Sequence, residues 1–249
     1  MAQMFLMMNT ARIGVGIQGL AIGSAAYLAA ADYCKDRKQG PSAKNFKDPE
    51  APKVAIVEHA DIRRMLLDMK AKVEGTRALG MKLMSHLEWA RSLAGKDDAK
   101  AGYHQGQVEL LTPLFKSYGS DMAFEVSTTA IQSMGGAGFL KDHPVEQYCR
   151  DAKIFSIYEG TNHIQALDLV GRKLSQNGGA NARAFLADVQ AFATKHKEHP
   201  VLGAAVAQLA KAQEAVAGTA MRFMMWNAQG KGERVPLAAN QFMTMMSET

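Results

Sequence analysis

Apolar residues recur along most of the chain at the three- and four-residue spacing of helices that pack against a core. Glycine, proline and polar residues separate these stretches. No segment alternates apolar and polar residues over a useful length, as a half-buried strand would. The pattern predicts an all-α fold, an up-and-down helical bundle with appended C-terminal helices. The expected helices are 4–36, 54–93, 107–134, 145–154, one from Thr161 to the glycines at 178–179, 181–197, 200–228 and 235–249.

A change in composition at Gly178 and Gly179 suggests a boundary in the chain. Residues 4–177 are expected to form the helical-bundle domain, and residues 181–249 an additional helical segment rich in alanine and methionine. This segment ends without a clear stop signal, so we expect it to be truncated.

The uncharged run from Ile13 to Ala31 is long enough to be considered as a membrane span, and Gly19 and Gly23 have GxxxG spacing. Gln18, Ser24 and four glycines interrupt the run, and a helix packed on most of its surface inside a soluble bundle explains it more simply. We therefore expect no membrane span. The N-terminus lacks the charged start and cleavage site of a signal peptide, which favours a cytoplasmic protein.

Composition excludes several classes of protein. The chain is 47% hydrophobic and 21% charged, which argues against disorder. Its net charge is +5, but lysine and arginine are scattered, so nucleic-acid binding is not expected. Cys34 and Cys149 are far apart and lack metal-ligand spacing, so we expect reduced thiols in the core and no metal site.

The motif YEGTN, residues 158–162, is the first candidate for chemistry. Thr161 can cap the following helix, whose free N–H groups would favour an anion, and Gly160 allows a ligand to approach the backbone closely. Apolar neighbours such as Phe155 and Ile157 predict a partly desolvated Glu159 with a raised pKa, which suits a general base. Alternatively, Glu159 only complements the helix N-terminus.

Three further features allow both a structural and a functional interpretation. The glycines at 135–138 permit close approach of a ligand, or they form a plain turn between helices. Arg12 lies within an apolar helix, where an unpaired charge is costly, so it requires a partner or a ligand. Arg37, at a helix end, interacts either with the helix dipole or with a phosphate.

Residues 131–174 resemble the signature of the C-terminal helical domain of the acyl-CoA dehydrogenase family. The shared features are a glutamine followed by GGxGF, a proline-containing loop, an RDAKI helix and YEGTNxIQ. The segment ending in CKDRKQG resembles the first helix of that domain, so the resemblance covers about residues 4–177. The remaining helices resemble the extra C-terminal segment of a subgroup with longer chains.

The resemblance implies an FAD-dependent oxidoreductase of fatty acid β-oxidation that converts an acyl-CoA to a trans-2-enoyl-CoA. In the family, the glutamate of YEG removes the α-proton while the β-hydrogen leaves as hydride to FAD, so Glu159 would be the catalytic base. Gly160 and Arg12 would lie beside the substrate, and Asn9 would contact its CoA moiety.

The resemblance also implies cofactor contacts and partners. Thr161 and His163 would contact FAD at the helix N-terminus. Four residues would hold the pyrophosphate and adenine half across a subunit interface: Arg37, Gln132, Gly135 and Gly136. The implied partners are an acyl-CoA substrate, an electron-transfer flavoprotein as acceptor, and further copies of the chain in a homodimer or homotetramer.

No part of the sequence matches the N-terminal helical domain or the middle β-domain of the family. The chain is therefore expected to be a C-terminal fragment that folds, binds FAD weakly or not at all, and has no turnover alone. Two alternatives are an acyl-CoA oxidase, which would use the same residues and pass electrons to oxygen, and a non-catalytic helical oligomerisation module.

Overall fold

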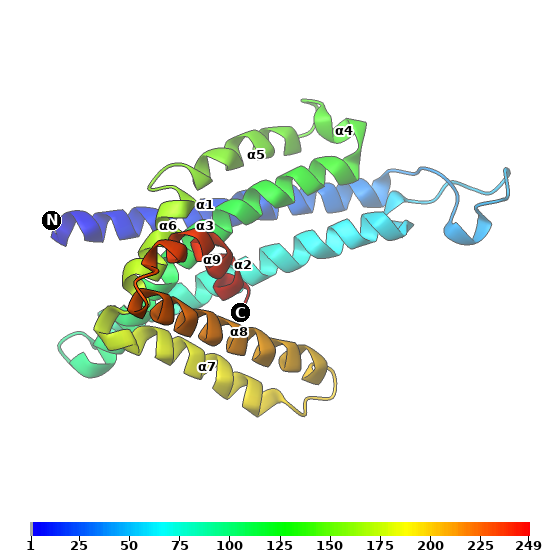
Figure 1. Ribbon diagram of the computed structural model, residues 1–249. Helices are drawn as coiled ribbons and strands as arrows, with labels where there is room; N and C mark the ends of the chain where they lie inside the picture. Colours follow the sequence, from blue (N-terminus) through cyan, green and yellow to red (C-terminus); the bar gives the residue numbers. More distant parts are fainter. Residues whose placement is uncertain (1) are drawn as a thin grey trace. The chain divides into compact units, whose positions relative to one another are not determined.

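The computed structural model describes residues 2–249, with side chains described from Met7 onward, and it confirms the all-α prediction (Figure 1). Its α-helices are α1 (Ala2–Asp36), α2 (Ala60–Leu93), α3 (Asp98–Met134), α4 (Gly136–Phe139), α5 (Val145–Ala152), α6 (Asn162–Asp168), α7 (Ala180–His196), α8 (Gly203–Ala228) and α9 (Val235–Glu248). Short turns are η1 (Ala43–Asn45), η2 (Ile56–Glu58), η3 (Lys153–Ser156), η4 (Leu169–Lys173), η5 (Gln176–Gly179) and η6 (Gly232–Arg234). No strand forms within the described residues, where Lys38 and Ala55 make an isolated bridge.

The largest boundary error concerns α3, which begins at Asp98 and not at 107. The side chain of Asp97 accepts the Lys100 N–H at 3.1 Å, and the side chain of Asp98 accepts the Gly95 N–H at 2.8 Å. The first bond caps the start of α3, and the second holds the preceding turn against it, so the polar segment from Asp98 that was expected to be a loop is helical. Pro113 lies inside α3 without ending it.

The chain divides into two compact units, to which α1, α2 and α3 each contribute segments. The first unit consists of the segment ending at Ile13, Leu79–Tyr118 and Glu159–Thr249. In this unit, α7 lies beside α8, and α9 packs against α6 and α8 (Figure 1). Side chains from α3, α8 and α9 share its core, including Leu110, Phe115, Phe223 and Phe242. The expected division into 4–177 and 181–249 stays a prediction.

The second unit consists of Gly14–Ala78 and Gly119–Tyr158. Met69, Val73, Met122 and Val126 belong to its larger core cluster. In this unit, a Cβ atom on Gly19 would lie 2.4 Å from the carbonyl oxygen of Gly119, and one on Gly23 would lie 2.8 Å from Met122 Sδ. The GxxxG spacing therefore allows the backbones of α1 and α3 to approach closely.

We expect Gly19→Ala to destabilise the chain by about 1–3 kcal/mol, because the new methyl group meets backbone atoms that cannot move aside easily. Gly14→Ala is the matched control in the same helix, where a Cβ meets nothing within 4 Å. It should stabilise by about 0.5–1 kcal/mol through helix propensity. Urea unfolding followed by circular dichroism measures the free energy of unfolding of both variants. Equal changes in this free energy would contradict the close packing at Gly19.

Among the described residues, the stretch Met7–Asp36 is long and apolar enough to cross a membrane by length and composition, and 39% of its most apolar window is buried inside the protein. Core helices of soluble proteins meet the same criterion. The expectation of no membrane span stays a prediction.

Both cysteines are free thiols. Cys34 is buried and donates a weak hydrogen bond to the Ser133 carbonyl oxygen at 3.7 Å, whereas Cys149 is half-buried. Burial raises the pKa of both thiols, which lowers their reactivity. Within residues 2–249, no group of three or more histidine, cysteine and acidic side chains is arranged to hold a metal ion.

Candidate functional site

The loop before α6 has an unusual backbone. Glu159 has φ 55° and Gly160 has φ 83°, so two successive residues adopt the left-handed conformation. Glycine does so without cost, but a glutamate must be held there by its surroundings. Thr161 Oγ1 accepts the Ile164 N–H at 3.3 Å, which confirms the predicted cap of α6.

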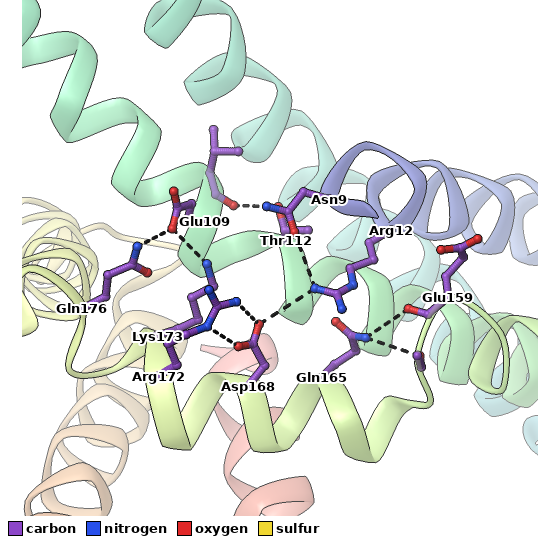
Figure 2. Close-up of polar contacts among 12 residues, drawn as sticks. Asn9, Arg12, Glu109, Thr112, Glu159, Gln165, Asp168, Arg172, Lys173 and Gln176 are labelled. Carbon is purple, nitrogen blue, oxygen red and sulfur yellow. Dashed lines mark hydrogen bonds and ion pairs between the residues drawn. The ribbon is translucent and has the colours of Figure 1, made fainter. Parts of the chain in front are cut away.

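Two buried polar side chains bind the carbonyl groups of this loop. Gln165 Nε2 donates to the carbonyl oxygens of Glu159 and Gly160, at 3.3 Å each (Figure 2). Lys116 Nζ donates to the Gly160 carbonyl oxygen at 2.8 Å and to Asn162 Oδ1 at 2.9 Å. Lys116 and Gln165 are not among the site residues predicted from the sequence. The signal that could have identified Lys116 is its position as a lone charge within the apolar run LLTPLFKSYG.

Arg12 has the partner that its burial requires. Its side chain is 9% exposed, and Nη1 lies 3.9 Å from Asp168 Oδ2 and 3.5 Å from Asn9 Oδ1. A Cβ atom on Gly160 would lie 3.8 Å from Arg12 Nη2. The structure therefore brings Arg12 close to both Asn9 and Gly160 and confirms that Arg12 is paired. The expected roles of the three residues at the substrate stay predictions.

A polar network continues from Asp168 along η4 (Figure 2). Asp168 accepts two hydrogen bonds from Arg172, at 2.7 and 3.0 Å, and these raise the pKa of Arg172. Next along the turn, Lys173 donates to Glu109 at 2.9 Å, and Gln176 donates to the same carboxylate. Burial by itself raises the pKa of Glu109, but these hydrogen bonds outweigh it and hold the pKa below the ordinary value. The bonds to Glu109 join η4 and η5 to α3.

The prediction that Glu159 is partly desolvated is wrong for this chain, because its side chain is exposed. Phe155 packs into a core with Val15 and Ala123, and Ile157 is itself 52% exposed, so these neighbours do not cover the carboxylate. In Figure 2 the carboxylate points away from Gln165, which binds only the backbone of the loop.

The residues buried in α6 and η4 are not those that the apolar spacing of the sequence predicts. Ile164 is 47% exposed, whereas Gln165 and Lys173 are buried together with Ala166 and Leu169. Burial of the two polar residues is possible because the loop carbonyls accept from Gln165 and Glu109 accepts from Lys173.

His163 is exposed, and its Nδ1 lies 3.0 Å from Oδ1 of Asn240, which α9 supplies. Thr161 is also exposed, so both expected flavin contacts are accessible on the surface of the first unit. Asn240 was not predicted from the sequence.

The remaining expected flavin residues belong to the second unit. Gln132, Gly135 and Gly136 lie together where α3 ends and α4 begins, and a Cβ on either glycine would meet nothing within 4 Å. Arg37 follows the end of α1, is exposed, and forms no ion pair with any described residue. Within the described residues, no hydrogen bond joins Arg37 to the other three. Open backbone and an exposed cation are features that suit a phosphate-bearing cofactor.

The family model described as "Acyl-CoA dehydrogenase, C-terminal domain" matches residues 1–175. The chain belongs to the acyl-CoA dehydrogenase family. The recognition made from the YEGTN and GGxGF motifs is thereby confirmed.

Similar proteins of this family come from diverse organisms. A butyryl-CoA dehydrogenase of Syntrophomonas wolfei is 39% identical over 212 residues, which are 85% of this chain and 34% of that protein. A 3-methylmercaptopropionyl-CoA dehydrogenase of Ruegeria pomeroyi is 43% identical over 182 residues, which are 73% of this chain and 30% of that protein. The chain thus spans about a third of the length of these relatives.

The structure of Caenorhabditis elegans ACDH-11 in complex with C11-CoA matches 97% of this chain and 37% of its own, with a TM-score of 0.73. Its sequence identity is 20%, so this similarity shows the fold alone.

Proposed function

We propose that this chain is the C-terminal part of an FAD-dependent acyl-CoA dehydrogenase that oxidises an acyl-CoA to a trans-2-enoyl-CoA. The observation that carries the proposal is the geometry of Glu159. Its carboxylate is exposed, while its backbone is held in a left-handed conformation by hydrogen bonds from a buried glutamine. A rigid loop that presents one carboxylate suits a general base.

In this proposal Glu159 accepts the α-proton of the thioester. Gly160 lies directly beside it and offers no side chain to obstruct the substrate. Arg12, whose buried guanidinium lies near Gly160, adds positive charge close to the base, and Asn9 contacts the CoA moiety.

When bound, FAD would supply the hydride-accepting chemistry for the β-hydrogen. Thr161 and His163 would contact it at the N-terminus of α6. Arg37, Gln132, Gly135 and Gly136 would hold the pyrophosphate and adenine half of a flavin across a subunit interface. Their exposure and the open backbone at the two glycines support this assignment. We also propose an electron-transfer flavoprotein as acceptor, a homodimer or homotetramer, and a cytoplasmic location.

Anaerobic addition of acyl-CoA to the full-length flavoenzyme that carries this chain tests the proposal. Butyryl-CoA and 3-methylmercaptopropionyl-CoA, which correspond to the names of the two relatives, are the first substrates to try. We expect the flavin absorbance to bleach and one trans-2-enoyl-CoA to form per flavin reduced. A flavin that remains oxidised with acyl-CoAs of all lengths would contradict the proposal. Rapid reoxidation by oxygen would instead indicate the oxidase alternative.

A further inference from the structure

A lysine lies in the middle of α3, within the apolar run that contains Leu114 and Phe115. Lys116 is fully buried, and a buried ammonium group is costly unless it is hydrogen-bonded. Its Nζ donates to the Gly160 carbonyl oxygen and to Asn162 Oδ1, on either side of the helix cap Thr161. The Lys116 ammonium group therefore donates hydrogen bonds to the loop that carries Glu159.

This loop requires such support. Glu159 and Gly160 both have positive φ, and a strained backbone persists only where its surroundings hold it. Gln165 binds both carbonyl oxygens from α6 at 3.3 Å, and Lys116 binds the second one from α3 at 2.8 Å. The lysine bond is the shorter one, as expected for a charged donor. Side chains from two elements, α6 and α3, thus bind the same turn.

We propose that Lys116 is a positioning residue, which holds the backbone of Gly160 and thereby sets the location of the Glu159 carboxylate. The inference rests on the proposed function of Glu159 as a base. Its physical reason is that proton abstraction depends steeply on geometry, and a displacement of 1 Å can cost about 100-fold in rate.

The test is Lys116→Met in the full-length flavoenzyme. The variant keeps a long buried side chain but cannot donate to the loop. We expect the rate of flavin bleaching at saturating acyl-CoA to fall by about 10- to 100-fold, while the substrate dissociation constant changes little. Stopped-flow absorbance at several acyl-CoA concentrations separates these two quantities.

Lys173→Met is the matched control. Lys173 is also buried in the first unit, but it donates to Glu109 on α3 and, within the described part of the chain, forms no hydrogen bond with the loop at 159–162. Both variants lose one buried ammonium and should lose similar thermal stability. Only the Lys116 variant should lose bleaching rate.

Asn162→Ala provides a second variant, which leaves Lys116 in place. It removes one acceptor of Lys116 and also the 3.3 Å hydrogen bond from Asn162 to the Ser117 carbonyl oxygen. We expect a decrease of about tenfold in the bleaching rate, corresponding to one hydrogen bond to a charged group. If Lys116→Met does not accumulate as folded protein, this variant decides the question by the same criteria.

Two results would overturn the inference while leaving the proposed function intact. One is a bleaching rate for folded Lys116→Met within about twofold of wild type, and the other is an equal loss in Lys116→Met and Lys173→Met. A wild-type flavoenzyme that fails to bleach would overturn the proposed function, and the inference with it.

Discussion

Glu159→Gln in the full-length flavoenzyme should slow acyl-CoA-dependent bleaching by about 1,000-fold, within the range of 10²–10⁴ typical of a general base. The amide has nearly the size of the carboxylate but cannot accept the α-proton. The backbone bonds that hold the loop come from Gln165 and Lys116 to carbonyl oxygens, so they do not depend on the Glu159 side chain. The variant should therefore fold, bind flavin and bind substrate as the wild type does.

Glu214→Gln controls for the loss of one negative charge. Glu214 is exposed on α8, in the same unit as Glu159. The flavin of the Glu214→Gln variant should bleach at the wild-type rate. Bleaching by Glu159→Gln at the wild-type rate would remove the base from the mechanism and favour the oligomerisation module.

Asp168→Ala should destabilise the chain by about 3 kcal/mol, because it leaves the buried guanidinium of Arg12 without its carboxylate. The Asp168 side chain is 17% exposed, and its Oδ2 lies 3.9 Å from Arg12 Nη1. We therefore expect a loss of stability at the lower end of the range found when one partner of a buried ion pair is removed. Unfolding of the chain by urea, followed by circular dichroism, gives the change in free energy.

Asp32→Ala is the control for this pair. Asp32 forms an exposed ion pair with Lys35 at 3.1 Å, and its loss should cost less than about 1 kcal/mol. The double variant Arg12→Met/Asp168→Ala should recover part of the loss, because no unpaired charge remains buried. A double variant less stable than the sum of the single effects would contradict this explanation.

The helices could be predicted from the sequence because apolar periodicity and glycine boundaries determine them locally. α1 and α7 to α9 agree with the expected ranges within a few residues. The start of α3 could not be predicted from apolar spacing, because its first turns are polar and rely on the side chains of Asp97 and Asp98. Cap hydrogen bonds of this kind become visible only when the turn geometry is known.

The candidate site was predictable in part. The motif singled out Glu159, Gly160 and Thr161, and the burial cost of a charge predicted that Arg12 has a partner. The identity of that partner, Asp168, depends on the approach of two helices distant in the sequence. The same holds for Lys116, whose acceptors Gly160 and Asn162 lie more than forty positions later in the chain.

The exposure of Glu159 shows why local sequence could not establish its environment. The motif follows apolar residues, but these side chains do not share one environment with Glu159. Phe155 enters a core, whereas Ile157 and Glu159 are exposed.

The most direct measurement is deuterium exchange at the α-carbon of an acyl-CoA, because it reports proton abstraction separately from hydride transfer. The full-length wild type and Glu159→Gln are incubated anaerobically with substrate in D2O, and the recovered acyl-CoA is analysed by mass spectrometry. We predict that the wild type incorporates deuterium at the α-position and that Glu159→Gln does not. Equal incorporation by both proteins would show that another group removes the α-proton and would contradict the assignment of Glu159 as the base.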